Sequence, residues 1–181
     1  DLANEIAKCN DMTDKPFAVN LTFLPIVNSP DYPGYIDAIV KGGVKVVATD
    51  ISSSVLETAK NGVYEMLALG RGMSEDRLKH CFQTNSDKSW EIKRQYKSVI
   101  DFKILNLMES FSRIGSKFDV IFCRNVLIYF SPDLKREILL KFHQHLNTGS
   151  YLILGASESL NGLSDKYEMI QCRPGIIYRA K

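Results

Sequence analysis

The chain has 181 residues, which is enough for one domain with a hydrophobic core. Its 45% hydrophobic and 24% charged residues are typical of a globular protein, and its formal net charge of +2 favours neither a nucleic acid nor a membrane as partner. The apolar runs are shorter than a membrane span and no signal peptide pattern opens the chain. We therefore expect a single domain, residues 1–181, with no membrane insertion.

The cysteines and histidines form no pattern typical of a metal site. They are scattered along the chain as Cys9, Cys81, Cys123, Cys172, His80, His143 and His145. There is no Cys-x-x-Cys motif, and two histidines spaced i and i+2 diverge on a helix. We expect reduced thiols, a cytoplasmic location and no structural metal.

The first 50 residues end in a clear strand. Residues 1–16 give a weak helical signal, and Phe17–Leu24 has the β-branched and aromatic character of a strand. Three prolines between Pro25 and Gly34 indicate a loop, and Tyr35–Val40 fits one short helix. Gly43–Asp50 is then a strand that ends in a carboxylate.

A capped helix follows this strand. Ser52–Ser54 supply an N-cap, the apolar residues after it recur at helical spacing, and Asn61-Gly62 ends the helix. Strand, acidic residue and capped helix make one half of a βαβ unit, which predicts a parallel sheet.

Residues 66–98 interrupt this alternation, and we predict that they form a small inserted β-subdomain. Met66–Phe82 reads as one helix, Gln83–Ser89 as a polar turn and Trp90–Tyr96 as a half-exposed strand. Between Arg77 and Lys97 there are six Lys or Arg residues against two acidic ones. Such a run is usually a solvated face, and a docking surface for an acidic partner is the alternative.

The second half of the chain alternates strand and helix and closes with a hairpin. Lys97–Leu105 reads as a strand and Phe118–Cys123 as a buried strand, and a helix opens at Ser131-Pro132-Asp133 with apolar residues every four positions. Asn147-Thr148-Gly149 ends that helix. Strands are then expected at Tyr151–Gly155, Tyr167–Cys172 and Ile176–Arg179. This order is typical of the α/β fold class, with a Rossmann-like class I methyltransferase sheet and a C-terminal antiparallel hairpin.

Polar residues follow three of the strands at their carboxyl ends, where open α/β sheets bind ligands. Asp50 could accept both ribose hydroxyls of a nucleoside, or it could begin a turn at the helix N-terminus. Asn106 could meet an adenine edge, although an Asn is equally expected in a turn.

Arg124 and Tyr129 have similar alternatives. Arg124 could act in the site or pair with an acid at the sheet rim. From composition alone, Tyr129 is better explained as a half-buried core residue with its hydroxyl hydrogen-bonded.

Four segments together resemble the CheR family of chemotaxis receptor methyltransferases. They are Phe122-Cys-Arg-Asn-Val-Leu-Ile-Tyr-Phe130, Gly155-Ala-Ser-Glu-Ser159, Ala48-Thr-Asp-Ile51 and Asn106-Leu-Met108. The resemblance covers residues 43–181. It implies a protein-glutamate O-methyltransferase that uses S-adenosylmethionine, releases S-adenosylhomocysteine and methylates the cytoplasmic domain of a chemoreceptor.

The resemblance also implies roles for particular residues. Asp50 would hold the ribose of the cofactor with Ile51 beside it, and Asn106 and Leu107 would frame the adenine.

On the next strand, Arg124 and Asn125 would lie beside the cofactor and the incoming substrate, and Tyr129 would lie near the sulfonium. Arg124 and Tyr129 are the candidate catalytic residues.

In the family, the segment matching residues 66–98 contacts receptors. Some members use it to bind a tethering peptide at the receptor tail, and their hairpin contains a Gly-x-Gly insertion. The turn Gln83–Lys88 is short and has no glycine, so it resembles the members that do not require the tether.

Two departures from the family leave an alternative open. Residues 20–37 lack the Ser-Thr-Gly-Glu loop, and the family's N-terminal helical domain has no counterpart. The alternative is a degenerate, non-catalytic domain that binds a protein partner. A nucleic-acid methyltransferase is less well supported, because the chain lacks the Asn/Asp-Pro-Pro-Tyr/Phe motif of amino-methylating enzymes.

Overall fold

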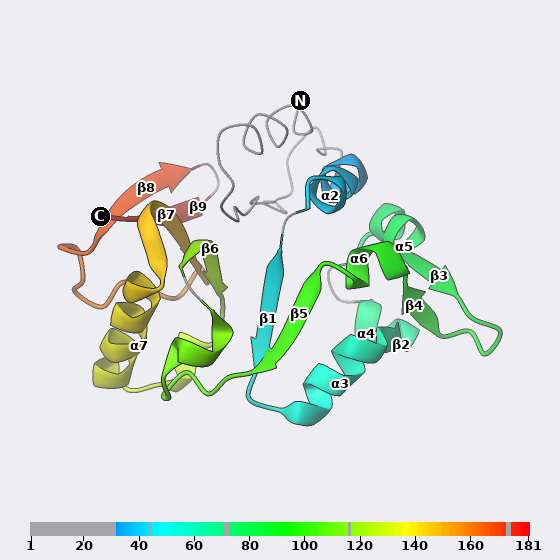
Figure 1. The fold of residues 1–181 in the computed structure, drawn as a ribbon, viewed down its shortest axis with the longest axis horizontal. Helices are drawn as coiled ribbons and strands as arrows, with labels where there is room; N and C mark the ends of the chain where they lie inside the picture. The colour runs from blue at the N-terminus through cyan, green and yellow to red at the C-terminus, as the bar shows by residue number, and fades with distance from the viewer. Residues whose placement is uncertain (1–31, 44, 71–72, 116, 173–174) are drawn as a thin grey trace. The chain divides into compact units, whose positions relative to one another are not determined.

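The computed structural model describes residues 32–43, 45–70, 73–115, 117–172 and 175–181. The chain divides into two compact units, Asp1–Leu105 and Asn106–Lys181, whose elements are labelled in Figure 1. The elements expected within residues 1–31 lie outside the described residues. The expectation of one domain over residues 1–181 stays a prediction.

The first unit contains the expected parallel pair. Strand β1 (Val46–Asp50) pairs in parallel with β5 (Ile100–Ile104), and Asp50 lies opposite Ile104 in the register. Helix α3 (Ser53–Asn61) connects to β1 and packs against both strands (Figure 1). The carboxyl ends of the two strands therefore meet at one edge of the pair.

The ends of α3 follow the sequence signals. The Ser52 hydroxyl accepts a hydrogen bond from the Val55 N–H, and Gly62 ends the helix at a φ of 71° with its N–H donating to the Thr58 carbonyl. A Cβ on Gly62 would lie 2.5 Å from Cγ2 of Ile92, so both the backbone conformation and the close packing require glycine here. Helix α2 (Tyr32–Lys41) begins three residues before the expected Tyr35, within the segment predicted as loop.

The prediction of one helix over 66–82 is wrong. The segment contains two short helices, α4 (Met66–Leu69) and α5 (Glu75–Cys81). Gly70 caps the first, and Ser74 begins the second by accepting a hydrogen bond from the Arg77 N–H. These two capping residues, a glycine and a serine, lie between the apolar groups and interrupt what looks like a continuous helical period.

The expected strand over 90–96 is confirmed only for its first three residues. Strand β4 (Trp90–Ile92) pairs antiparallel with β3 (Phe82–Thr84) and with β2 (Val63–Tyr64), in the order β2-β4-β3. The chain then turns into the short helix α6 (Arg94–Lys97). The sequence seemed to alternate because Trp90 and Ile92 of the strand are two residues apart, and Tyr96, which is buried in the following helix, lies at an even spacing from both.

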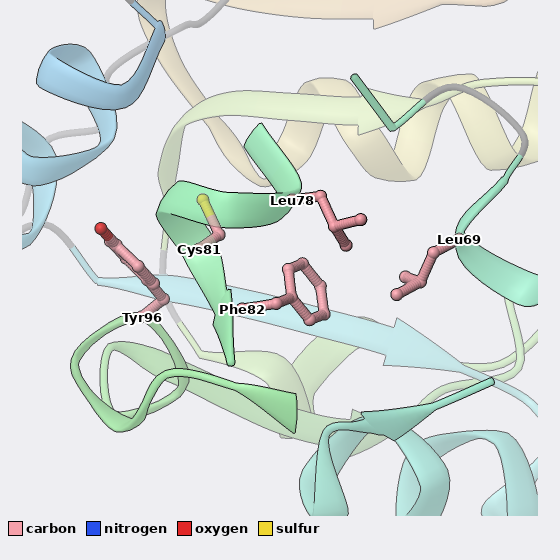
Figure 2. Packing of buried hydrophobic residues seen from close by; sticks show 5 residues of the cluster. All are labelled: Leu69, Leu78, Cys81, Phe82 and Tyr96. Carbon is pink, nitrogen blue, oxygen red and sulfur yellow. The ribbon is translucent and has the colours of Figure 1, made fainter. Parts of the chain in front are cut away.

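This region has its own hydrophobic cluster, shown in Figure 2. Its buried members are Leu69, Leu78, Cys81, Phe82 and Tyr96. They come from α4, α5, β3 and α6, so short elements with little stability of their own are held by side-chain packing. The assignment of residues 66–98 as an inserted β-subdomain stays a prediction that this cluster supports.

The second unit contains a four-stranded sheet in the order β6-β7-β9-β8. Strand β6 (Phe118–Cys123) is parallel to β7 (Leu146–Leu154), whereas β9 (Gly175–Ala180) is antiparallel to both β7 and β8 (Tyr167–Cys172). The closing antiparallel hairpin is therefore confirmed, and with it the α/β class.

Helix α7 (Pro132–Gln144) begins as predicted, with the Ser131 hydroxyl accepting a hydrogen bond from the Leu134 N–H. Its buried residues are Ile138, Leu139 and Phe142. The following strand begins at Leu146, five residues before the expected Tyr151. The register with β6 shifts between these two residues, and Gly149 lies there with a φ of 85°. Asn147-Thr148-Gly149, which were expected to end the helix, thus lie within β7 and form an irregularity in that strand.

None of the described helices has the length and apolar character that a membrane span requires.

Candidate functional site

Asp50 lies at the carboxyl end of β1 and is half-buried. One carboxylate oxygen, Oδ1, accepts a hydrogen bond of 2.8 Å from the Ser52 N–H, which is the turn-forming role considered from the sequence. Among the described residues, nothing donates to Oδ2. Ile51 follows with 67% of its surface exposed.

Asn106 forms a turn directly after β5. Its side-chain Oδ1 accepts a hydrogen bond of 3.0 Å from the Met108 N–H, and its Nδ2 lies 3.5 Å from a carboxylate oxygen of Glu109. The side-chain oxygen of Asn106 therefore has the turn-forming role that was the alternative in the sequence analysis. A contact between its amide nitrogen and adenine stays a prediction.

A lysine on α7 holds the same loop through its carbonyl groups. Nζ of Lys141 donates to the backbone oxygens of Leu107 at 3.2 Å, Met108 at 2.7 Å and Glu109 at 3.1 Å. It also lies 5.8 Å from the centroid of the Phe111 ring. One cation thus satisfies three carbonyls and fixes the path of the loop predicted to frame the adenine.

Arg124 and Tyr129 lie on the loop that follows β6. Arg124 is exposed and forms no ion pair with any described acidic residue, so the structure does not support pairing at the sheet rim. Tyr129 is 82% exposed at the end of the 3₁₀ helix Leu127–Tyr129, labelled η2, and its hydroxyl contacts no described partner. The interpretation of Tyr129 as a half-buried core residue is wrong.

The loop is nevertheless firmly attached to its unit. Leu127 has no exposed surface and anchors the middle of the loop in the core. Asn125 adopts a φ of 60°, a left-handed conformation that Asn tolerates better than most residues. Within this loop Leu127 is buried, whereas Arg124, Asn125 and Tyr129 are exposed.

Glu158, beyond the end of β7, holds the loop from the other side. Its Oε2 accepts hydrogen bonds from the N–H groups of Gly155 at 2.6 Å and Asn125 at 2.9 Å. Its Oε1 accepts from Val126 at 2.9 Å and Ile128 at 3.3 Å. Partial burial raises the pKa of this carboxyl, but the backbone N–H donors outweigh that effect, and the net pKa lies below the ordinary value.

The sequence analysis missed Glu158 and Lys141 as functional candidates. Glu158 belongs to a motif quoted for the family resemblance, but its side chain received no role. A glycine followed three residues later by an acid, directly after a buried strand, is a signal that could have found it. Lys141 carries no comparable signal, because its partners are backbone carbonyls 32 to 34 residues away in sequence.

The structure brings some of the predicted site residues together. Arg124, Asn125 and Tyr129 share one loop, and that loop belongs to the same unit as Asn106-Leu107. Asp50 and Ile51 belong to the other unit, so a single cofactor site formed by all seven residues stays a prediction. Within the described residues, no group of three or more His, Cys, Asp or Glu residues could hold a metal ion.

Comparison with known proteins identifies relatives along most of the chain. The chemotaxis protein methyltransferase 1 of Pseudomonas aeruginosa is 54% identical over 142 residues, which make up 78% of this chain and 52% of that protein. The protein of the same name from Vibrio cholerae is 47% identical over 167 residues, 92% of this chain and 58% of that protein. The chain thus spans little more than half the length of these relatives.

Among solved structures, a TehB-like SAM-dependent methyltransferase from Corynebacterium glutamicum matches with a TM-score of 0.48 and 13% identity, over 81% of this chain and 74% of that one. The family described as "CheR methyltransferase, SAM binding domain" matches residues 35–176. The resemblance noted in the sequence is therefore confirmed: the chain belongs to the CheR methyltransferase family, within its SAM-binding domain.

Proposed function

We propose that this chain binds S-adenosylmethionine in the cytoplasm and methylates glutamate side chains of a chemoreceptor cytoplasmic domain. The family membership supports the cofactor and the reaction class. The observation that carries the proposal is the loop after β6, which holds Arg124, without an ion pair to any described residue, and an exposed Tyr129 on a backbone held by Leu127 and Glu158.

The residues present fit the cofactor in their chemistry. Asp50 retains a carboxylate oxygen without a described partner, which suits a ribose hydroxyl, and Asn106 retains an amide donor for a purine edge. Ile51 and Leu107 offer apolar surface beside them, and Asn125 follows on the next loop. When bound, S-adenosylmethionine supplies an electrophilic methyl group on a sulfonium.

The chain's own residues then have a limited task. A glutamate carboxylate is already ionised near neutral pH, so the chain need not supply a general base. Arg124, which has no ion-pair partner among the described residues, binds that carboxylate, because a guanidinium can donate two parallel hydrogen bonds to it. The face of the Tyr129 ring would lie against the positive charge of the bound cofactor and would exclude water. Alignment of the two reactants accounts for most of the rate enhancement.

The region over residues 66–98 would provide the receptor contact without a tethering peptide. The Gln83–Lys88 turn closes on itself: the Asn85 N–H donates to the Ser89 carbonyl at 2.9 Å, and the Ser89 hydroxyl donates to Asp87 at 2.6 Å. Lys88 adopts a φ of 68° within it. A turn whose polar groups are satisfied internally has less to offer a peptide strand.

Calorimetric titration with S-adenosylhomocysteine tests cofactor binding, and transfer of a labelled methyl group to a receptor cytoplasmic fragment tests the reaction. We expect saturable binding, and we expect Arg124→Gln to lower methyl transfer by about 100-fold through loss of substrate alignment. Arg113→Gln, an exposed arginine without a described ion pair, is the control. Absence of binding would instead support the non-catalytic alternative.

A further inference from the structure

The carboxylate of Glu158 is surrounded by backbone donors from two separate segments. Gly155 is close in sequence, whereas Asn125, Val126 and Ile128 lie 30 to 33 residues away. Each oxygen accepts two N–H groups at distances from 2.6 to 3.3 Å. The loop that carries the candidate catalytic residues is therefore tied to the end of β7 through one side chain.

Only an ionised carboxylate satisfies this arrangement. A carboxylate offers about four lone-pair sites and no donor, which matches the four N–H groups found here. A glutamine would direct its NH₂ group toward two of those N–H groups, and a protonated acid would direct its O–H toward one. Either change leaves a backbone donor facing another donor, and the loop must move to relieve the conflict.

The residues around the Glu158 carboxylate leave room for it and donate to it. Gly155 has no side chain where a Cβ would lie 2.7 Å from Oε2 of Glu158 and 2.9 Å from the Asn125 nitrogen. Asn125 adopts its left-handed conformation at the same point, and its N–H donates to the carboxylate. The neighbouring Cys123 thiol stays neutral, because burial and the charge of Glu158 raise its pKa to about 12.

We propose that ionised Glu158 is a positioning residue, which sets the conformation of the loop 124–129 and thereby the placement of Arg124 and Tyr129 for methyl transfer. This inference rests on the proposed function for its catalytic consequence. The geometric part of the proposal, that Glu158 orders the loop by accepting hydrogen bonds from the loop's backbone amides, does not depend on the proposed function. Glu158 itself touches neither reactant in this proposal.

The test compares Glu158→Gln and Glu158→Asp with the wild type and with Glu137→Gln, which removes an exposed glutamate on α7. Two quantities are measured on the full chain well below its unfolding temperature. The first is the amide proton chemical shifts of the four donors by NMR without cofactor. The second is kcat and KM for methyl transfer to a receptor cytoplasmic fragment.

We expect the four amide resonances to move together in Glu158→Gln and kcat to fall by about 100-fold in the folded variant, as misplacement of a catalytic loop predicts. Glu158→Asp keeps the charge but is one methylene shorter. Its four amide resonances and its kcat should therefore lie between those of the wild type and those of Glu158→Gln. Glu137→Gln should leave both unchanged. A merely structural role would lower stability without changing kcat in the folded protein.

Unshifted donor amides in folded Glu158→Gln, or wild-type kcat in that variant, would overturn the proposal. Should the glutamine variant fail to fold, acid titration of the wild type decides the geometric part. The four donor amides should then report one common midpoint, and independent midpoints would contradict it. A wild type without methyl transfer would disprove the proposed function instead, which separates the two failures.

Discussion

Replacing Gly155 with alanine tests the close approach between the loop after β6 and the end of β7. The added Cβ would lie 2.7 Å from Oε2 of Glu158 and 2.9 Å from the backbone nitrogen of Asn125, and would also contact the Asn125 side-chain oxygen. That oxygen can rotate away, but the backbone nitrogen moves only if the loop moves. Gly155 does not have a φ in the left-handed region, so the cost is steric and not conformational.

The expected cost follows from two opposing effects. Overpacking a tight contact costs about 1–3 kcal/mol. Replacing glycine with alanine also restricts the unfolded chain, which offsets about 0.4–1 kcal/mol of that cost. We expect a net loss of about 1–2 kcal/mol in the free energy of unfolding, or a melting temperature lower by roughly 2–8 °C for a chain of this size.

Urea unfolding measures this loss, and Gly175→Ala is the matched control. A Cβ on Gly175 meets nothing within 4 Å and its φ lies outside the left-handed region, so its stability should change by less than about 0.5 kcal/mol. Equal unfolding midpoints for Gly155→Ala and the wild type, with unchanged amide resonances for Asn125 and Val126, would refute the close approach.

Three further outcomes are expected. Leu127→Ala removes a fully buried anchor and should cost about 2–5 kcal/mol by urea unfolding, whereas Ile176→Ala, 43% exposed, should cost much less. Lys141→Met keeps the aliphatic stem but removes the donor to three carbonyls; we expect a loss of about 1–2 kcal/mol and faster hydrogen exchange after β5, with Lys135→Met as an unaffected control. The pKa of Glu158 lies below the ordinary value of 4.5, so its contribution to stability is complete above that pH and is lost as the pH falls through the lower folded-state pKa. The stability difference between wild type and Glu158→Gln should therefore shrink as the pH is lowered from 4.5.

The elements with a strong periodic pattern were predictable. Strand Phe118–Cys123 has the predicted bounds, and the helix after Ser131 begins where the cap and proline place it. The strand is a nearly continuous apolar run followed by the charged Arg124, and the helix has an apolar face at helical spacing after its polar cap. Local sequence is sufficient where local and tertiary preferences agree.

The region after α3 was less predictable, because tertiary packing overrides its local pattern. A continuous apolar spacing over 66–82 suggested one helix, but Gly70 and Ser74 divide it, and Phe82 enters a strand to join the cluster in Figure 2. Tyr96 gave a strand-like alternation and instead packs as part of a helical turn, with its hydroxyl donating to Asp37 at 2.7 Å.

For the candidate site, the sequence could indicate which residue types reach the sheet edge but not their backbone partners. Composition favoured a half-buried Tyr129, yet this residue is 82% exposed and the buried residue of that turn is Leu127. A short 3₁₀ helix alternates its faces differently from a strand or an α-helix, so the inward residue is not evident before the turn is known.

Glu158 and Lys141 explain how exposed loops in one unit can hold defined conformations. The Glu158 carboxylate accepts hydrogen bonds from N–H groups of the loop after β6, and the Lys141 ammonium donates hydrogen bonds to carbonyl groups of the loop after β5. Backbone groups at the ends of strands lack partners in the sheet, so a single charge of the right sign replaces several missing hydrogen bonds. Among the described residues, the side chains of Arg124 and Tyr129 then need no partners. The proposed methyl transfer depends on alignment more than on proton transfer, so it would favour an arrangement in which the residues that fix the loops differ from those that meet the reactants.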